Sequence, residues 1–425
     1  MSGRQRLYLG IDLGTSGCRS VVIDADGVSL AQSDVALPAP LRDGAAVTQA
    51  PALWWPAVCE CIRRVTAQVD ATAIRALAVD GTSGTLLLAD EHGEPLGPAL
   101  MYNDGRAQAE AQRIATVAPP QCAAHGASSA LAKLLHLLPR PEARYALHQA
   151  DWIVGKLTGQ WGVSDENNCL KLGYDPVGKC WPAWLASLID DNTLLPKVVK
   201  PGTPIASIDS RAARQLGLST DTVVVAGTTD STAAFIATGA QQVGEAVTSL
   251  GSTLVMKVIS SAPIFAPEYG VYSQPLGDFW LAGGGSNSGG AVLLHYFTPD
   301  ELTEMTPKLQ PDRPTGLDYY PLLTAGERFP VLDPNLPPRL TPHPDDDVQF
   351  FQAMLEGMAG IEQRAYQLLQ ALGAPYPTSV RSAGGGAANN NWTHIRQRRL
   401  KVPMLTPAHQ DAAYGAAQLT QQGDR

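Results

Sequence analysis

The sequence lacks the marks of secreted and membrane-spanning proteins. It has six cysteines in 425 residues and no C-x-x-C pair, so no disulfide framework is predicted and the thiols should be reduced. No run approaches the roughly 18 apolar residues that a membrane span needs. Asp12 interrupts the first apolar segment too early for a signal peptide. We therefore expect a cytoplasmic protein without a membrane partner.

Basic charge and several catalytic motifs are also scarce. The chain has 31 Lys and Arg against 40 Asp and Glu, a net charge of -9, which offers no basic field to a nucleic acid partner. Its eight histidines form no H-E-x-x-H motif, and none pairs with a G-x-S-x-G serine, which argues against zinc proteases and serine hydrolases. The glycine runs at 283–290 and 384–386 miss the G-x-G-x-x-G pattern of dinucleotide-binding folds.

What the sequence does contain is α/β patterning. Short aliphatic runs predict strands at 7–11, 21–23, 76–79 and 86–88. Helical periodicity predicts a helix over 52–69 and a longer one over 347–372, where acids precede the helix and Gly373 follows it. Because 425 residues exceed what one hydrophobic core usually serves, we expect two or three domains.

A short internal sequence repeat predicts a duplicated fold. Residues 13–16 (Leu-Gly-Thr-Ser) precede an aliphatic strand, and residues 250–253 (Leu-Gly-Ser-Thr) do the same. The repeat predicts two lobes with a cleft between them, covering 1–239 and 240–425. Small-residue turns that recur by chance would explain the same match.

The segment around Asp12 could bind a phosphate group. Asp12 stands at a strand end and is followed by Gly14, Thr15 and Ser16, whose small size lets backbone N–H groups approach an anion. The counterpart, with Gly251, Ser252 and Thr253, allows the same interpretation. A plain β-hairpin is the alternative at both places.

Two further turns carry candidate polar groups. Asp230 lies between an apolar strand and an Ala-rich helix, where a carboxylate can accept a hydroxyl proton as general base. An ordinary helix-start aspartate is the alternative. The segment 80–85 (Asp-Gly-Thr-Ser-Gly-Thr) repeats the pattern with side chains able to hydrogen-bond a polyol, although alone it would be read as a turn. The glycine runs could form flat walls for adenine or ribose, or simply flexible turns.

Taken in order, these segments resemble the FGGY carbohydrate kinases, a branch of the superfamily of actin, hexokinase and heat-shock ATPases. The matching segments are 10–16 and 249–253 (phosphate motifs), 226–231 (catalytic aspartate), 383–387 with Asn389 and Trp392 (adenosine), and 411–417 (closing helix). The resemblance spans nearly the whole chain. It implies an α/β fold of two lobes, the duplicated actin-like (ribonuclease H-like) ATPase fold with an interlobe cleft.

The resemblance also implies roles for individual residues. Asp230 and Asp12 would be catalytic, Mg²⁺ would be held by Asp12 through water, and Asp12, Ser83 and Asp230 would contact a small-molecule sugar. The residues implied to bind ATP are Gly14, Thr15, Ser16, Gly251, Ser252, Thr253, Gly284, Gly384, Gly385 and Asn389. A homodimer would be compatible with the resemblance.

The substrate expected from the resemblance is a ketopentose. The chain is shorter than the family's usual length of about 500 residues, and segment 81–85 stands where xylulokinases of the standard type carry Gly-Gln-Met-His-Gly. These features resemble a compact, xylulokinase-like subgroup for which D-ribulose is the implied substrate. The family stretch Lys-Leu-x-Trp appears as 133–136 (Lys-Leu-Leu-His), with Ala130 in place of a hydroxyl residue, which leaves the role of that stretch open. The alternatives are a D-xylulose kinase and an actin-like binding module without kinase activity.

Overall fold

The computed structural model describes residues 6–190 and 192–422. The chain divides into two compact units, Met1–Ala237 with Asp411–Arg425, and Thr238–Gln410. The predicted division into 1–239 and 240–425 differs from this at the C-terminal end. There, α12 (Ala412–Gln422) packs on the sheet of the first unit. Sequence patterning could not foresee this, because the contact joins segments about 400 residues apart.

The first unit is built on a six-stranded sheet with the order β12-β13-β6-β1-β2-β3. Its strands are β1 (Leu7–Leu13), β2 (Gly17–Asp24), β3 (Ser29–Ala36), β6 (Ile74–Gly81), β12 (Pro204–Ser207) and β13 (Val223–Val225). The first three form an antiparallel meander, and β6 and β13 continue the sheet in parallel with β1. Every residue of β1 is buried, as expected for a central strand covered on both faces.

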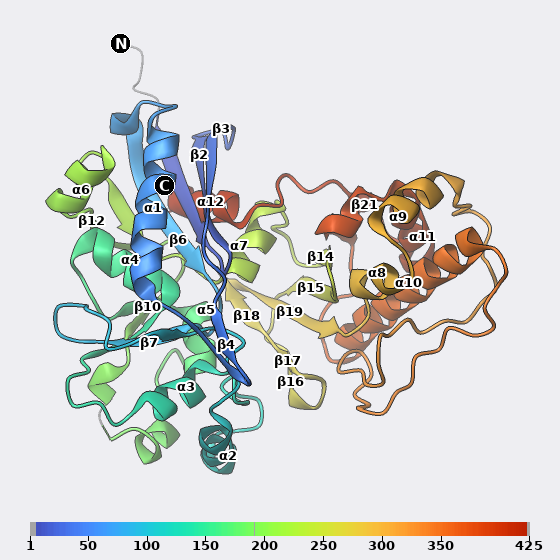
Figure 1. The fold of residues 1–425 in the computed structure, drawn as a ribbon, viewed down its shortest axis with the longest axis horizontal. Helices are drawn as coiled ribbons and strands as arrows, with labels where there is room; N and C mark the ends of the chain where they lie inside the picture. Colours follow the sequence, from blue (N-terminus) through green and yellow to red (C-terminus); the bar gives the residue numbers. More distant parts are fainter. Residues whose placement is uncertain (1–5, 191, 423–425) are drawn as a thin grey trace. The chain divides into compact units, whose positions relative to one another are not determined.

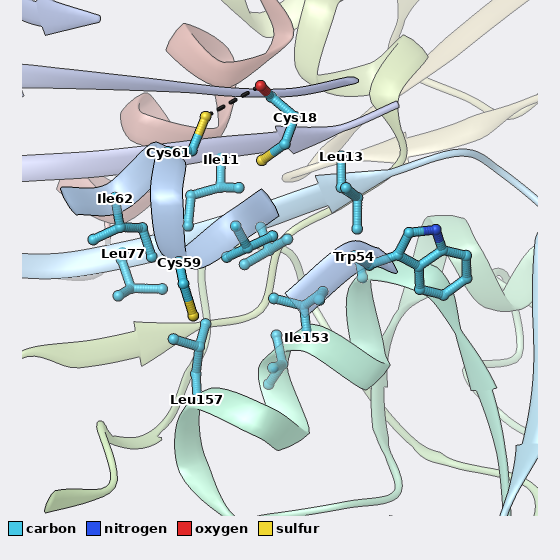
Figure 2. Packing of buried hydrophobic residues seen from close by; sticks show 14 of the residues in the cluster. Ile11, Leu13, Cys18, Trp54, Cys59, Cys61, Ile62, Leu77, Ile153 and Leu157 are labelled. Carbon is cyan, nitrogen blue, oxygen red and sulfur yellow. Dashed lines mark hydrogen bonds between the residues drawn. The ribbon is translucent and has the colours of Figure 1, made fainter. Parts of the chain in front are cut away.

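Helices cover both faces of this sheet (Figure 1). They include α1 (Trp54–Thr66), α4 (Gln149–Thr158), α6 (Ser210–Leu216) and α7 (Asp230–Ala237). α1 packs on β2 and β3, whereas α12 packs on β1, β6 and α7. The approach of α12 requires Gly10, because a Cβ there would lie 1.8 Å from the carbonyl oxygen of Ala413. Figure 2 shows Ile11 of β1, Trp54 of α1 and Ile153 of α4 in the core between these elements.

The rest of the first unit adds a five-stranded sheet with the order β4-β5-β8-β7-β9. Its strands are β4 (Leu41–Asp43), β5 (Ala46–Gln49), β7 (Leu86–Ala89), β8 (Ala99–Leu100) and β9 (Tyr145–His148). The neighbouring elements are α2 (Gln108–Val117), α3 (Ala130–Leu137), α5 (Glu166–Cys169), β10 (Val163–Asp165) and β11 (Lys197–Val199). α3 packs on β7 and α2.

The second unit has its own six-stranded sheet, with the order β18-β19-β15-β14-β20-β21. Its strands are β14 (Glu245–Leu250), β15 (Leu254–Ser260), β18 (Gln274–Leu276), β19 (Phe279–Ser286), β20 (Ser379–Ala383) and β21 (Met404–Leu405), and β16 (Phe265–Ala266) pairs separately with β17 (Val271–Tyr272). Its helices are α8 (Gly290–Tyr296), α9 (Pro299–Met305), α10 (Asp347–Ala371) and α11 (Asn390–Leu400). The helix predicted over 347–372 is confirmed as α10, with Asp346 capping its N-terminus by accepting a hydrogen bond from the Val348 N–H.

The predicted duplication is confirmed by sheet topology. In the first unit the order β3-β2-β1-β6-β13 places an antiparallel meander beside two parallel strands, and β19-β15-β14-β20-β21 repeats that order and those directions. The repeated segments form the turns of the matching hairpins β1–β2 and β14–β15. Among the described residues, no helix has both the length and the apolar character needed to cross a membrane.

Candidate active site

Three aspartates stand where neighbouring parallel strands of the first unit end. Asp12 of β1 pairs in register with Asp80 of β6, and Gly81 forms a bridge with Thr229, the residue before Asp230. Carboxyl ends of parallel strands share one edge of a sheet, where α/β folds bind ligands. The structure therefore brings Asp12 and Asp230 to the same edge, as the sequence motifs predicted, and adds Asp80 between them.

Asp80 is the most unusual of these groups. The sequence placed it in the polar segment 80–85 but gave it no role of its own. Its side chain is completely buried, and neither carboxyl oxygen contacts a hydrogen-bond donor among residues 6–190 and 192–422. Burial raises the pKa of Asp80 well above its usual range, and the negative charges of Asp12, Asp230 and Asp411 act in the same direction. The carboxyl group is therefore biased toward its neutral form. The available signal was Asp80's position at the end of an apolar run, which repeats the setting of Asp12.

Asp12 remains closer to the surface. Burial raises the pKa of Asp12, whereas a side-chain hydrogen bond with Asp80 and the positive charge of Arg19 oppose the shift. Nη1 of Arg19 donates a hydrogen bond to Oδ2 of Asp12 at 3.2 Å. Arg19 lies on the next strand and is exposed. A carboxylate held in this way fits a hydrated Mg²⁺, for which carboxylate and water oxygens are preferred ligands.

The turn after Asp12 presents backbone to the surface. Its hairpin is closed by a hydrogen bond from the Gly14 N–H to the carbonyl of Gly17 at 2.9 Å. Thr15 is half-buried and Ser16 exposed, so both hydroxyls lie within reach of a ligand. This geometry is compatible with the predicted phosphate contact and equally with a plain turn.

Asp230 begins α7. Its Oδ1 accepts a hydrogen bond from the Ser231 N–H at 2.6 Å, and its side chain is only half-buried. The close backbone packing before it depends on Gly227, where a Cβ would lie 1.8 Å from the carbonyl oxygen of Val79 in β6. The strand-to-helix turn predicted from the sequence is thus present, and it fixes Asp230 beside the end of β6.

The segment 81–85 follows Asp80 and is held from several sides. Oε1 of Gln149 accepts hydrogen bonds from the Thr82 N–H and hydroxyl at 3.1 and 2.7 Å. The Lys133 ammonium donates to the Gly84 carbonyl at 2.7 Å. Ser83 is half-buried, and within the described ranges its hydroxyl has no hydrogen-bond partner. The predicted sugar-binding hydroxyl is therefore free on a firmly held loop.

The second unit contains a pocket of about 700 Å³ beside the β14–β15 turn. It is lined by Leu250, Gly251, Ser252, Gly290, Leu293, Leu294, Leu302, Thr303, Thr306, Phe351, Leu355, Gly385, Gly386, Ala388, Asn389 and Trp392. Its lining carries no acidic or basic side chain. The pocket thus offers apolar side chains for a flat ring system, with small residues and hydroxyls beside them.

Glycines make the wall of this pocket possible. Gly384 has φ +81, and a Cβ there would lie 3.0 Å from the carbonyl group of Leu250. A Cβ at Gly386 would lie 2.4 Å from the ring of Trp392. Asn389 begins α11, and its Oδ1 accepts a hydrogen bond from the Trp392 N–H at 2.9 Å. A neutral wall of this kind is compatible with the adenosine contact predicted from the sequence.

The seven nucleotide residues predicted in the second unit separate into three groups. Gly251, Ser252, Gly385 and Asn389 line the pocket, whereas Gly384 and Thr253 lie next to lining residues. Gly284 does not line it: Gly284 lies in β19, and a Cβ there would lie 2.6 Å from the ring of Phe329. Close packing against this aromatic core residue explains why position 284 is a glycine. The sequence pattern could not separate a glycine needed for packing from one that meets a ligand.

A buried ion pair supports the hairpin beside the pocket. Nε and Nη2 of Arg396 in α11 donate to the two carboxylate oxygens of Glu362 in α10, both at 2.7 Å. The hydroxyl of Thr248 in β14 donates to the same carboxylate, and Nη1 of Arg396 donates to the Ser382 hydroxyl in β20 at 2.6 Å. This network ties both helices to the two strands whose ends border the pocket.

Comparison with known proteins assigns the family. Residues 7–125 match the model of the N-terminal domain of the FGGY family of carbohydrate kinases, and residues 246–421 match that of the C-terminal domain. The chain belongs to the FGGY family of carbohydrate kinases. It is therefore a phosphotransferase that acts on a sugar with ATP as donor.

Several relatives align with almost the whole of this FGGY kinase. A xylulose kinase of Streptomyces coelicolor is 28% identical over 97% of this chain and 86% of its own length. A D-ribulokinase of Saccharomyces cerevisiae is 22% identical over 97% of this chain and 71% of its own length. Among solved structures, a xylulose kinase of Brucella ovis superposes with a TM-score of 0.89 at 25% identity, covering 98% of this chain and 91% of that one. These neighbours confirm the predicted two-domain actin-like fold.

Proposed function

We propose that this kinase phosphorylates a ketopentose at its C5 hydroxyl, with D-ribulose as substrate and D-ribulose 5-phosphate as product. The observation that carries the proposal is the edge of the first sheet, where Asp12, Asp80 and Asp230 come together and the segment with Ser83 follows Asp80. The Ser83 hydroxyl has no hydrogen-bond partner among the described residues. Hydroxyl and carboxylate groups are suitable partners for a polyol. The D-ribulokinase relative supports the same substrate class.

Asp230 acts as the general base in the proposed reaction. Its carboxylate orients the C5 hydroxyl and accepts its proton as the sugar oxygen attacks the γ-phosphorus of ATP in line. The new O–P bond forms while the bond from the γ-phosphorus to the bridging oxygen breaks, and ADP leaves. The hydrogen bond from the Ser231 N–H holds one carboxylate oxygen of Asp230 in place at the start of α7.

The remaining residues position the two substrates. Asp12 and Ser83 contact sugar hydroxyls, while the turn at Gly14, Thr15 and Ser16 offers backbone N–H groups to phosphate oxygens. In the second unit, the pocket holds adenosine, and the Gly251–Thr253 turn holds phosphates. Mg²⁺, held by Asp12 through water, would neutralise charge on the phosphate oxygens when bound.

D-xylulose is the second candidate substrate. Xylulose kinases are prominent among the relatives, including the one from Streptomyces coelicolor that aligns over 97% of this chain. The two ketopentoses differ in configuration at one carbon, so the choice between them depends on which side chains around 81–85 meet that carbon. The segment Gly81-Thr82-Ser83-Gly84-Thr85 replaces the bulkier Gly-Gln-Met-His-Gly of standard xylulokinases, which favours D-ribulose.

The test is an ADP-release assay with MgATP against D-ribulose, D-xylulose, L-ribulose, glycerol and a control without sugar. We expect the highest kcat/KM with D-ribulose and almost no turnover in Asp230→Ala. A preference for D-xylulose would keep the mechanism and overturn the substrate. No turnover with any sugar, by protein that still binds ATP, would instead favour a nucleotide-binding module.

A further inference from the structure

Lys133 of α3 is a buried lysine that has no carboxylate partner among the described residues. Its side chain is completely buried, and its Nζ donates hydrogen bonds to the carbonyl oxygens of Gly84 and Ser128 at 2.7 and 2.8 Å. It forms no ion pair with any carboxylate of the described residues. The nearby Asp104 is already engaged by Arg106, whose Nη2 donates to it at 2.7 Å.

Such a side chain is costly to bury. An ammonium group loses its hydration on burial, and two neutral carbonyls replace that hydration only in part. The neighbouring positions of α3, Leu131, Ala132, Leu134 and Leu135, are all buried and apolar. An apolar residue would therefore suit position 133 at least as well for folding alone. The reason for a lysine should lie in what its Nζ holds.

The group that Lys133 holds is the loop next to Asp80. Gly84 has φ +86, and a Cβ there would meet the Lys171 side chain at 3.3 Å. The Nζ of Lys171 also donates to the Ser83 carbonyl at 3.4 Å. Two lysines from different elements thus bind consecutive carbonyls of one loop, while the Ser83 hydroxyl has no partner among the described residues. The arrangement fixes the backbone and leaves the hydroxyl available.

We propose that Lys133 is a positioning residue for sugar recognition: by holding the Gly84 carbonyl, it orients the Ser83 hydroxyl toward the sugar. This inference rests on the proposed function, in which Ser83 contacts the ketopentose. Lys133 itself touches neither the sugar nor the reacting atoms. Its removal should loosen the loop and weaken sugar binding, and it should leave nucleotide binding in the second unit unchanged.

The test compares the parent with Lys133→Met, which keeps the length of the side chain and removes its charge and donors. We expect the KM for the sugar to rise about 10-fold, the KM for MgATP to change less than about twofold, and kcat to fall less than the sugar kcat/KM. The melting temperature should stay level or rise, and sugar should no longer raise it, whereas ATP still should. Lys197→Met, at an exposed lysine of β11, is the matched control.

A second variant keeps the test independent of the first. Lys171→Met removes the longer contact to the same loop, so we expect a smaller rise in the sugar KM, about two- to fivefold. An unchanged sugar KM in both variants overturns the proposal, and so does a Lys133→Met protein that fails to fold or melts at a lower temperature. If the parent enzyme phosphorylates no sugar, both the proposed function and this inference are wrong. If the parent is active and the sugar KM of the variants is unchanged, only this inference is wrong.

Discussion

The two sheets share one strand order but carry opposite chemistry at matching strand ends. In the first unit, Asp12 of β1 lies opposite Asp80 of β6. In the second unit, the corresponding pair is Ser249 of β14 opposite Ala383 of β20. The duplicated fold therefore provides two similar hairpins, and only the side chains decide their use. A neutral edge can accept a polyphosphate without charge repulsion, whereas an acidic edge suits hydroxyl groups and a hydrated cation.

The largest effect on activity should follow from removing the charge of Asp230 at the acidic edge of the first sheet. Asp230→Asn keeps the shape of the side chain and its acceptor for the Ser231 N–H, but the amide cannot take a proton. We expect kcat to fall about 10³-fold, since general-base catalysis typically contributes 10²–10⁴. ATP affinity, measured by calorimetry without sugar, should be unchanged. Activity within tenfold of the parent would remove Asp230 from the role of base.

The second unit should depend on its buried ion pair for stability. Arg396→Met leaves the Glu362 carboxylate buried without its bidentate partner, an arrangement that costs about 3 kcal/mol or more. Denaturant unfolding should show this loss. The double variant Arg396→Met with Glu362→Met should recover part of it, because no charge then remains buried. A single variant as stable as the parent would contradict the view that this pair supports β14 and β20.

Lys133 is an ionisable group buried in the first unit, so the free energy of unfolding should depend on pH. Burial lowers the pKa of Lys133 to about 7, with Lys171 acting in the same direction and Asp104 opposing it. The unfolded amine titrates near its ordinary pKa of about 10.4. Between about pH 7 and 10 the unfolded chain therefore binds more protons than the folded one, and this group makes stability rise with pH.

Lys133→Met should remove that dependence. Relative to the variant, the parent's free energy of unfolding should increase by about 2 kcal/mol from pH 7 to pH 9. Urea unfolding at the two pH values measures the difference, with Lys308→Met at an exposed lysine of the second unit as control. A parent-to-variant difference that does not change with pH would mean that Lys133 titrates near its ordinary pKa.

Features set by local sequence could be predicted, whereas features set by packing between distant segments could not. Asp12 and Asp230 follow apolar runs and precede small residues, so local patterning placed them at strand ends, and the helix over 347–372 was predicted from periodicity. Asp80 lies on β6, which packs against α4 and α12, and Lys133 lies on α3, which packs against β7 and the short turn Leu170–Leu172. Burial of this kind has no local signature. For the same reason, the packing of α12 on the first unit and of Gly284 against Phe329 emerged only from the structure.

The neutral edge of the second unit can be tested by adding a charge to it. Ser252 is exposed and lines the pocket of the second unit, so Ser252→Asp would place a carboxylate on a wall that has none. Repulsion of the ATP phosphates should raise the KM for MgATP about 10-fold at low ionic strength, and added salt should reduce the effect by screening. Ser252→Ala, which adds no charge, should change that KM less than about threefold. Because position 252 is exposed, the melting temperature of both variants should match the parent. Equal KM values for the Asp and Ala variants would mean that phosphates do not approach this turn, and that neutrality at the second edge serves packing instead of nucleotide binding.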